Sequence, residues 1–164
     1  MIETTLQRWT LAGLVALGGC MAQSSDRADT SADVRRESAP LVGAWRLAWL
    51  DMPGPDGKIQ RISDAKGSLI YTSEGAVSVQ VMFAQAQPAT PNAPVQYAQD
   101  GYEASFGRYA VDEAARTVTH HYEGSLVRAL LSQDLPRRYR FTDGRLILTS
   151  TRADEQWLAA WERY

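Results

Sequence analysis

Short segments in which apolar and polar residues alternate run through residues 41–164 and are separated by tight-turn signals. The clearest signal is Asp143-Gly144, which lies between residues 137–142 and residues 145–151. This dipeptide is typical of a two-residue hairpin, because both central positions of a type I′ turn need positive φ. No long segment shows a clean stripe with a 3.6-residue period. The pattern therefore predicts an all-β domain built from antiparallel hairpins.

Two more hairpins and two single strands are predicted from the same alternation. One hairpin pairs residues 67–72 with residues 76–83 around Ser73-Glu74-Gly75. The other hairpin pairs residues 102–111 with residues 116–123 around the loop at residues 112–115. The single strands are an opening strand at residues 41–52 and a closing strand at residues 156–163. In the opening strand, Trp45, Leu47 and Trp49 are expected on one face, and a short terminal helix is the alternative for the closing strand.

Three segments do not fit the strand pattern. Residues 53–66 are rich in turn-forming residues, and residues 84–101 contain Pro88, Pro91 and Pro94. Proline is poorly tolerated in a central strand, so we expect residues 84–101 to form a mobile flap at one mouth of a barrel. Residues 124–136 are expected to hold a helical turn, with three apolar side chains on one side, namely Val127, Leu130 and Leu131.

Hairpins that follow one another without crossover helices leave unpaired sheet edges, and closing the sheet into a barrel removes those edges. We therefore predict that residues 41–164 form an antiparallel up-and-down β-barrel of about 8–10 strands. A barrel of this size can hold one small ligand.

Residues 9–19, WTLAGLVALGG, form an uncharged apolar run that ends at Cys20. A membrane-spanning helix needs about twenty such residues, so this run indicates an export signal over residues 1–19. Leu17-Gly18-Gly19-Cys20 resembles the lipobox of bacterial lipoproteins. The resemblance implies cleavage before Cys20 and a lipid anchor on its thiol. Met21 stands where an inner-membrane retention signal would have Asp, which implies the outer membrane of the cell envelope, facing the periplasm.

The rest of residues 20–40 is small, polar and mixed in charge. Such a stretch buries too little apolar surface to offset its ordering entropy. We interpret it as a flexible tether between the lipidated Cys20 and the barrel.

Five blocks of residues 41–164, in order, resemble the lipocalin-like domain family, a calycin-type β-barrel group. The blocks are Leu41-Val42-Gly43-Ala44-Trp45-Arg46-Leu47, Gly67-Ser68-Leu69-Ile70-Tyr71-Thr72 with Glu74-Gly75, residues 102–109 ending in Phe106-Gly107-Arg108-Tyr109, Val118-Thr119-His120-His121 with Ser125, and residues 137–148 with Asp143-Gly144-Arg145-Leu146. The resemblance implies a lipocalin-like fold. It also implies a contact between Trp45 and an Arg near the C-terminus, Arg163 or Arg152, at the floor of the barrel.

The composition excludes several classes of function. Seventeen Lys and Arg against nineteen Asp and Glu leave no basic excess for nucleic acid. One Cys and two adjacent His cannot form an internal disulfide or a Cys- and His-rich zinc site. The chain contains no phosphate-binding loop, dinucleotide fingerprint or nucleophile elbow, so we predict no cofactor and no metal.

Alternation places a small set of polar and aromatic side chains in the lumen. Val118, His120 and Tyr122 share one face of their strand, and Arg137 shares a face with Tyr139. The predicted ligand-binding set is His120, Arg137, Tyr122, Tyr139, Tyr71 and Tyr109. In the alternative interpretation, Arg137 stacks on a Trp or pairs with a buried acid, and His120 is a hydrogen-bonded interior histidine.

Three functions remain open on the sequence alone. The first is a lipid-anchored barrel that binds a small, mostly hydrophobic molecule, with His120 and Arg137 orienting its polar end. The second is an isomerase or cyclase, with His120 as general acid or base and Arg137 or a Tyr stabilising an enolate-like charge. The third is an interaction module of the envelope with a solid, side-chain-filled interior.

Overall fold

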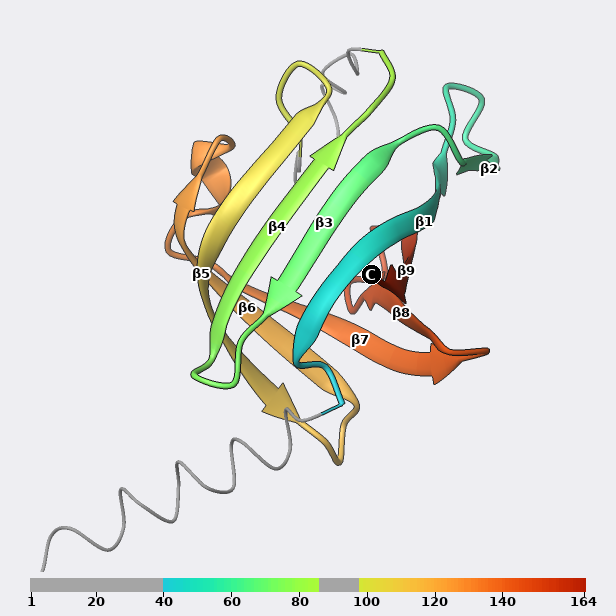
Figure 1. Ribbon diagram of the computed structural model, residues 1–164. Helices are drawn as coiled ribbons and strands as arrows, with labels where there is room; N and C mark the ends of the chain where they lie inside the picture. Colours follow the sequence, from blue (N-terminus) through green and yellow to red (C-terminus); the bar gives the residue numbers. More distant parts are fainter. Residues whose placement is uncertain (1–39, 86–97) are drawn as a thin grey trace, which may run out of the picture.

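The computed structural model describes residues 40–85 and 98–164, which form one antiparallel sheet that closes on itself (Figure 1). The strands in these residues are β1 (Gly43–Pro53), β2 (Ile59–Ile62), β3 (Lys66–Tyr71), β4 (Ala76–Met82), β5 (Tyr102–Asp112), β6 (Thr117–Ser125), β7 (Asp134–Thr142), β8 (Arg145–Ser150) and β9 (Leu158–Arg163). A short 3-10 helix, η1 (Arg128–Leu130), lies between β6 and β7. The order is β2-β1-β3-β4-β5-β6-β7-β8-β9, and β1 also pairs with β9. The predicted up-and-down β-barrel is confirmed.

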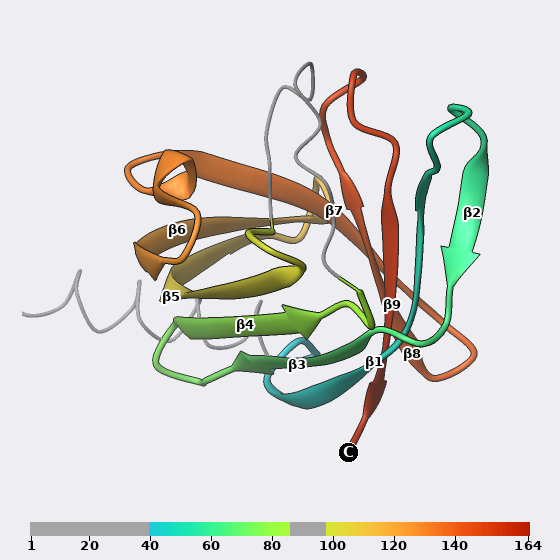
Figure 2. The same cartoon turned by 90° about the horizontal axis from the view of Figure 1, so that it is seen from above.

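The ring has eight strand positions, although it contains nine strands in the described residues. β9 pairs with β1 from Trp45 to Asp51, so it occupies one edge of that strand. β3 pairs with β1 as far as Arg46 and β2 pairs with it from Leu50, both on the other edge. β2 and β3 therefore follow one another along a single edge, and seen from above β2 lies beside β1 at the margin of the ring (Figure 2).

Three tight hairpins gather at the end of the barrel where β1 begins, which we call the closed end. Asp143 and Gly144 have φ of 50° and 72°, the two positive values that a type I′ turn needs. Gly75 has φ of 83° and donates its N–H to the Thr72 carbonyl. In the third turn, Asp112 Oδ1 accepts from the Ala115 N–H. The opposite end, where β5 begins and β6 ends, is the open end.

The inward faces of the strands form one continuous core. It is made of buried aliphatic and aromatic side chains, namely Leu41, Trp45, Leu69, Tyr71, Val77, Val79, Val81, Tyr109, Val118, Tyr122, Leu130, Leu135, Tyr139, Leu146, Leu148, Ala159 and Trp161. At about 25 cal/mol per Å² of apolar surface, this burial is the main force that holds the sheet closed.

One prediction for β1 is wrong. Trp45 and Leu47 face the core, but the register against β9 shifts between Leu47 and Trp49, so that Trp49 pairs with Ala160 and Leu50 pairs with Ala159. A β-bulge inserts one residue and reverses the alternation beyond it. Trp49 therefore turns to the outer face, where its ring lies 4.6 Å from Arg61 Cζ.

The other segments are resolved as follows. Residues 53–66 contain β2, a strand that the sequence pattern did not reveal. The closing segment is strand β9 and not a helix. The helical turn predicted in residues 124–136 is present as η1. Leu130 is fully buried, and Val127 and Leu131 pack against the core.

The predictions for residues 1–19, for Cys20 and for the tether up to residue 39 lie outside the described residues, as does most of the flap predicted at residues 84–101. In the part of the chain that is described, no helix has the length and apolar character required to cross a membrane.

Candidate functional site

All six predicted binding residues face the lumen and are buried. The exposed fractions are 1% for Tyr71 and His120, 4% for Tyr139, 5% for Tyr109 and Tyr122, and 6% for Arg137. The register explains this clustering, because His120 on β6 lies opposite Tyr109 on β5 and opposite Leu135 on β7. The structure thus brings together side chains from β3, β5, β6 and β7.

His120 is held between two tyrosines. The Tyr71 hydroxyl lies 2.7 Å from Nε2, and the Tyr122 hydroxyl lies 3.1 Å from Nδ1. A neutral imidazole accepts at one nitrogen and donates at the other, so both nitrogens of His120 are satisfied. The rings also pack together, with centroids 5.6 Å apart in each pair.

The surroundings of these hydrogen-bonded side chains favour their neutral forms. Burial lowers the pKa of His120 well below 6.5, and the Arg137 charge and His121 act in the same direction. Burial also raises the pKa of Tyr71 well above 10. Neutral His120 is therefore the stable form near pH 7, with both nitrogens already engaged. This arrangement suits a structural hydrogen-bond bridge better than a general base poised near neutral pH.

Arg137 projects into the lumen from β7, opposite Val118 on β6 and Ser150 on β8. Its Cζ lies 5.3 Å from the ring centroid of Trp157, which packs against the core from the segment before β9. The stacking that the alternative interpretation proposed for Arg137 is present. The neighbouring Arg138 points outward and is exposed.

Glu103 is a lumen residue that the sequence analysis did not single out. It lies opposite the buried Val81 at the open end. It is on the same face of β5 as the buried residues Ser105, Gly107 and Tyr109. Burial raises the pKa of the Glu103 carboxyl to about 7, and the nearby Arg137 charge partly opposes this. Strand alternation could have identified Glu103, because every second residue back from Tyr109 along β5 faces the lumen.

The other polar groups near Glu103 have partners. Ser105 Oγ and Ser125 Oγ lie 3.0 Å apart, and Ser125 Oγ also accepts from the Val127 N–H. Glu155 at the same end accepts from the Ser150 hydroxyl and forms an ion pair with Arg152. Within the described residues, no hydrogen bond or ion pair is formed by the Glu103 carboxyl, which makes it the unpaired acid of the lumen.

The floor contact is confirmed for Arg163 and not for Arg152. Arg163 Cζ lies 4.1 Å from the ring centroid of Trp45. The guanidinium of Arg163 also donates to the carbonyls of Val42 and Pro40, and the Trp45 indole N–H donates to the Leu41 carbonyl. Cation–π contact and hydrogen bonds together close this end of the barrel.

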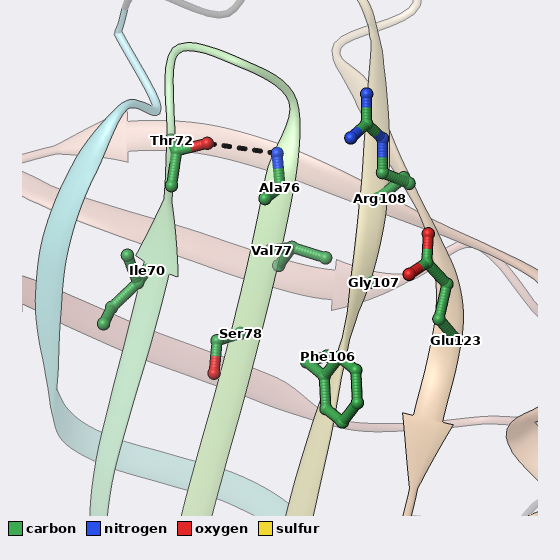
Figure 3. Close-up of a pocket in the computed structure, with 9 residues that line it drawn as sticks. All are labelled: Ile70, Thr72, Ala76, Val77, Ser78, Phe106, Gly107, Arg108 and Glu123. Atoms are coloured by element: carbon green, nitrogen blue, oxygen red, sulfur yellow. Dashed lines mark hydrogen bonds between the residues drawn. The ribbon is translucent and has the colours of Figure 1, made fainter.

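Two hollows lie on the outer face, and none of the six predicted residues lines them. The first, of about 310 Å³, is bordered by Ile70, Phe106, Arg108 and Glu123 on neighbouring strands (Figure 3). The second, of about 750 Å³, lies where β1 and β3 separate and is bordered by Trp49, Lys66 and Arg145. Both are shallow and open to solvent.

The described residues contain no cluster of three or more His, Cys, Asp or Glu side chains that could hold a metal ion. A family model described as a lipocalin-like domain matches residues 42–163, which is nearly the whole barrel. No curated protein gives a significant match to the chain.

Proposed function

The chain belongs to the lipocalin-like domain family, and on that premise we propose that its barrel binds one small, mostly hydrophobic molecule in the open-end half of the lumen. The family assignment indicates a binding role in general terms. The position and chemistry of the site are inferred from the lumen side chains.

The observation that carries the proposal is the buried guanidinium of Arg137 in a largely apolar lumen. Burying a charge is costly unless hydrogen bonds, opposite charges or aromatic faces compensate it. Arg137 is 6% exposed, its Cζ lies 5.3 Å from the ring centroid of Trp157, and the buried Val118 lies opposite it on β6. Such a lumen suits a ligand with an apolar body and a single polar end.

The closed-end half supplies a base on which the ligand rests. Tyr71 contacts Tyr109 edge to face at a centroid distance of 4.7 Å, and the Tyr109 hydroxyl donates to the Thr72 carbonyl. Together with the bridge from Tyr71 through His120 to Tyr122, these rings occupy the middle of the barrel. In this proposal His120 fixes the tyrosines that the ligand touches, and Arg137 orients its polar end.

Native mass spectrometry of the protein extracted from its own membranes tests the proposal. The wild-type chain should carry a non-covalent small molecule, and Arg137→Met should carry much less of it. Arg138→Met is the matched control, because Arg138 is the next residue on β7 and points outward. Equal retention by both variants, or no bound molecule in the wild type, contradicts the proposal. If the wild type converts the bound molecule, and His120→Ala still binds it but no longer converts it, the isomerase alternative is supported instead.

We also propose that lipid on Cys20 anchors the barrel to the outer membrane, facing the periplasm. The lipobox-like Leu17-Gly18-Gly19-Cys20 supports acylation of Cys20. Several acyl chains anchor a protein far more firmly than one chain does. Cys20→Ala should move the protein from the membrane fraction to the soluble fraction, while Ser24→Ala should leave it with the membranes. Sedimentation of Cys20→Ala with the membranes would contradict acylation.

A further inference from the structure

We propose that the outer face of β3, β4 and β5 docks on the surface of an anionic phospholipid bilayer. Its apolar side chains enter the headgroup region, and Lys66 and Arg108 lie against lipid phosphates. This contact does not depend on a ligand in the lumen. It adds a second attachment to the anchor proposed at Cys20, and it determines which side of the barrel meets the membrane.

The first observation is that exposed hydrophobic side chains gather on this face. Five of the eight large ones in the described residues are found here, namely Ile70 on β3, Met82 on β4, Tyr102 and Phe106 on β5, and Leu126 just after β6. Phe106 is 59% exposed, the highest fraction of the five. Single exposed apolar residues are ordinary on a protein surface, whereas a group of them on one face indicates a contact surface.

The strand register brings these side chains together. Met82 pairs with Tyr102, and Ile70 and Phe106 both pair with Ser78. The backbone N–H of Leu126 donates to the Ala104 carbonyl, so Leu126 adjoins the face beside β5. Neighbouring strands lie about 5 Å apart, and the apolar groups are therefore close neighbours. The three strands lie side by side at the front of Figure 1, and no other described element covers them.

The second observation is that the charges of this face have one sign. Its outward residues are Lys66, Ser68, Ile70, Ala76, Ser78, Gln80, Met82, Tyr102, Ala104, Phe106 and Arg108, and none of them is acidic. This is unusual in a chain in which acids outnumber Lys and Arg, nineteen to seventeen. Lys66 lies toward the open end and Arg108 toward the closed end, so the two cations flank the apolar group.

Neither cation is neutralised by an acid at the margin. Glu123, on β6, borders the same hollow as Arg108 (Figure 3), but the described residues include no ion pair between them. Arg46, on β1 beside Ser68, is a third cation at the margin, and it forms an ion pair with Glu162. Lys66 forms no ion pair within the described residues. The face therefore offers two positive charges to an anionic partner.

These charges favour a bilayer over a second copy of the chain. Anionic headgroups attract Lys and Arg, and each such side chain near the surface contributes about 1 kcal/mol. Side chains such as Phe106 and Met82 gain further by entering the boundary between headgroups and acyl chains. Two copies of this face would bring only positive charges together, and that repulsion opposes a dimer.

The sequence before the barrel favours the same partner. The proposed anchor residue Cys20 is twenty positions before Pro40, where the described residues begin. Even a fully extended chain of this length spans no more than about 70 Å. A barrel anchored in this way stays near the membrane, and the resulting high effective concentration makes even a weak surface contact count.

The experiment places a fluorophore on the face of the full-length chain. Cys20 is the only cysteine, so Cys20→Ala removes both the anchor and the competing thiol. Gln80→Cys in this background carries an environment-sensitive dye at the centre of the face, where Gln80 is exposed. With vesicles of equal parts phosphatidylglycerol and phosphatidylcholine, we expect a blue shift of the dye. Binding to vesicles of phosphatidylcholine alone should be weaker by about tenfold or more.

A dye at Arg138→Cys in the same background is the positional control, because Arg138 is exposed on the outer face of β7. It should show no shift. The apolar residues 9–19 could bind vesicles by themselves, but they would not move the dye at position 80 and spare the dye at position 138.

Two further variants of the Gln80→Cys protein test the two parts of the face. Phe106→Ser should weaken binding, whereas Ile59→Ser should not, because Ile59 is equally exposed but lies on β2. Lys66→Glu combined with Arg108→Glu should abolish the preference for phosphatidylglycerol. Circular dichroism confirms that each variant is folded.

Three results would overturn the proposal. The first is an equal shift of the dyes at positions 80 and 138, or no shift of either. The second is equal binding to the two kinds of vesicle. The third is a shift at position 80 that appears without vesicles as the protein concentration is raised, which would assign the face to a second copy of the chain.

Discussion

The hydroxyl of Tyr71 lies 2.7 Å from Nε2 of His120 in the middle of the barrel. The contact joins residues that are 49 positions apart in the sequence, and it is continued by Tyr122 on the other side of the imidazole ring. All three side chains are at least 95% buried, so none of these polar atoms can turn to bulk water instead. The bridge is therefore sensitive to the loss of any one partner.

The first prediction concerns this bridge. Tyr71→Phe removes the hydroxyl and leaves one nitrogen of His120 buried without a partner. We expect it to lower the free energy of unfolding by about 1–3 kcal/mol. Urea unfolding followed by tryptophan fluorescence measures the change. Tyr102→Phe is the control, because Tyr102 is 38% exposed, and it should change stability by less than about 0.5 kcal/mol. Equal effects would contradict a bridge that stabilises the fold.

The second prediction concerns the pH dependence caused by His120, whose pKa in the folded chain is well below 6.5. At a pH between the pKa of His120 in the folded chain and 6.5, the unfolded chain binds a proton that the folded chain does not bind. The free energy of unfolding should therefore decrease as the pH falls below 6.5, by about 1.4 kcal/mol per pH unit from this residue. His120→Gln cannot titrate, so unfolding curves at a series of pH values should give it a smaller slope. Parallel profiles would contradict the assignment.

Glu103 produces a dependence of the opposite sign, which is the third prediction. Its pKa rises from 4.5 in the unfolded chain to about 7 in the folded chain, so the folded chain binds the extra proton between these values. Its contribution to stability is complete below pH 4.5 and is lost as the pH rises through 7. Between pH 4.5 and pH 8, Glu103→Gln should gain on the order of 2 kcal/mol relative to the wild type, since partial exposure weakens the effect. Glu123→Gln should gain nothing.

Alternation and turn chemistry were enough to predict the barrel and the inward faces. The faces of β6 and β7 follow from counting in twos, so His120, Tyr122, Arg137 and Tyr139 were all placed correctly in the lumen. Asp143-Gly144 fixed the last hairpin, because its conformation is determined by two adjacent residues. These are local rules, and each holds wherever the strand is regular.

Features that depend on irregular strands or on partners distant in sequence were not predicted. The bulge in β1 turned Trp49 outward, and bulges have no reliable signal in the sequence. The bridge between Tyr71 and Tyr122 through His120 depends on the register of several strand pairs at once. Glu103 followed the alternation rule, but a lone acid near the start of a strand resembles a solvated surface residue.

The fourth prediction uses a close approach between β5 and β6. A Cβ at Gly107 would clash with the backbone carbonyl of His121, at the point where β6 also bulges. Gly107→Ala should therefore lower the free energy of unfolding by about 3 kcal/mol or more, or prevent folding. Gly144→Ala is the comparison, since it has open space around its Cβ and only the cost of positive φ, about 1 kcal/mol. Circular dichroism and thermal unfolding measure both, and equal losses would contradict the close approach.

The last prediction concerns the floor. Arg163 stacks on Trp45 and donates through separate nitrogens to the carbonyls of Val42 and Pro40, which is possible because a guanidinium is planar and forked. Lysine keeps the positive charge but has neither the plane nor the fork. Arg163→Lys should therefore lower the free energy of unfolding by about 1–2 kcal/mol, whereas Arg138→Lys on the outer face should be neutral. If charge alone held the floor, both variants would match the wild type. Because β1 and β9 close the ring here, hydrogen exchange should accelerate first in these two strands of Arg163→Lys, and uniform acceleration across the sheet would show that the contact does not hold the seam.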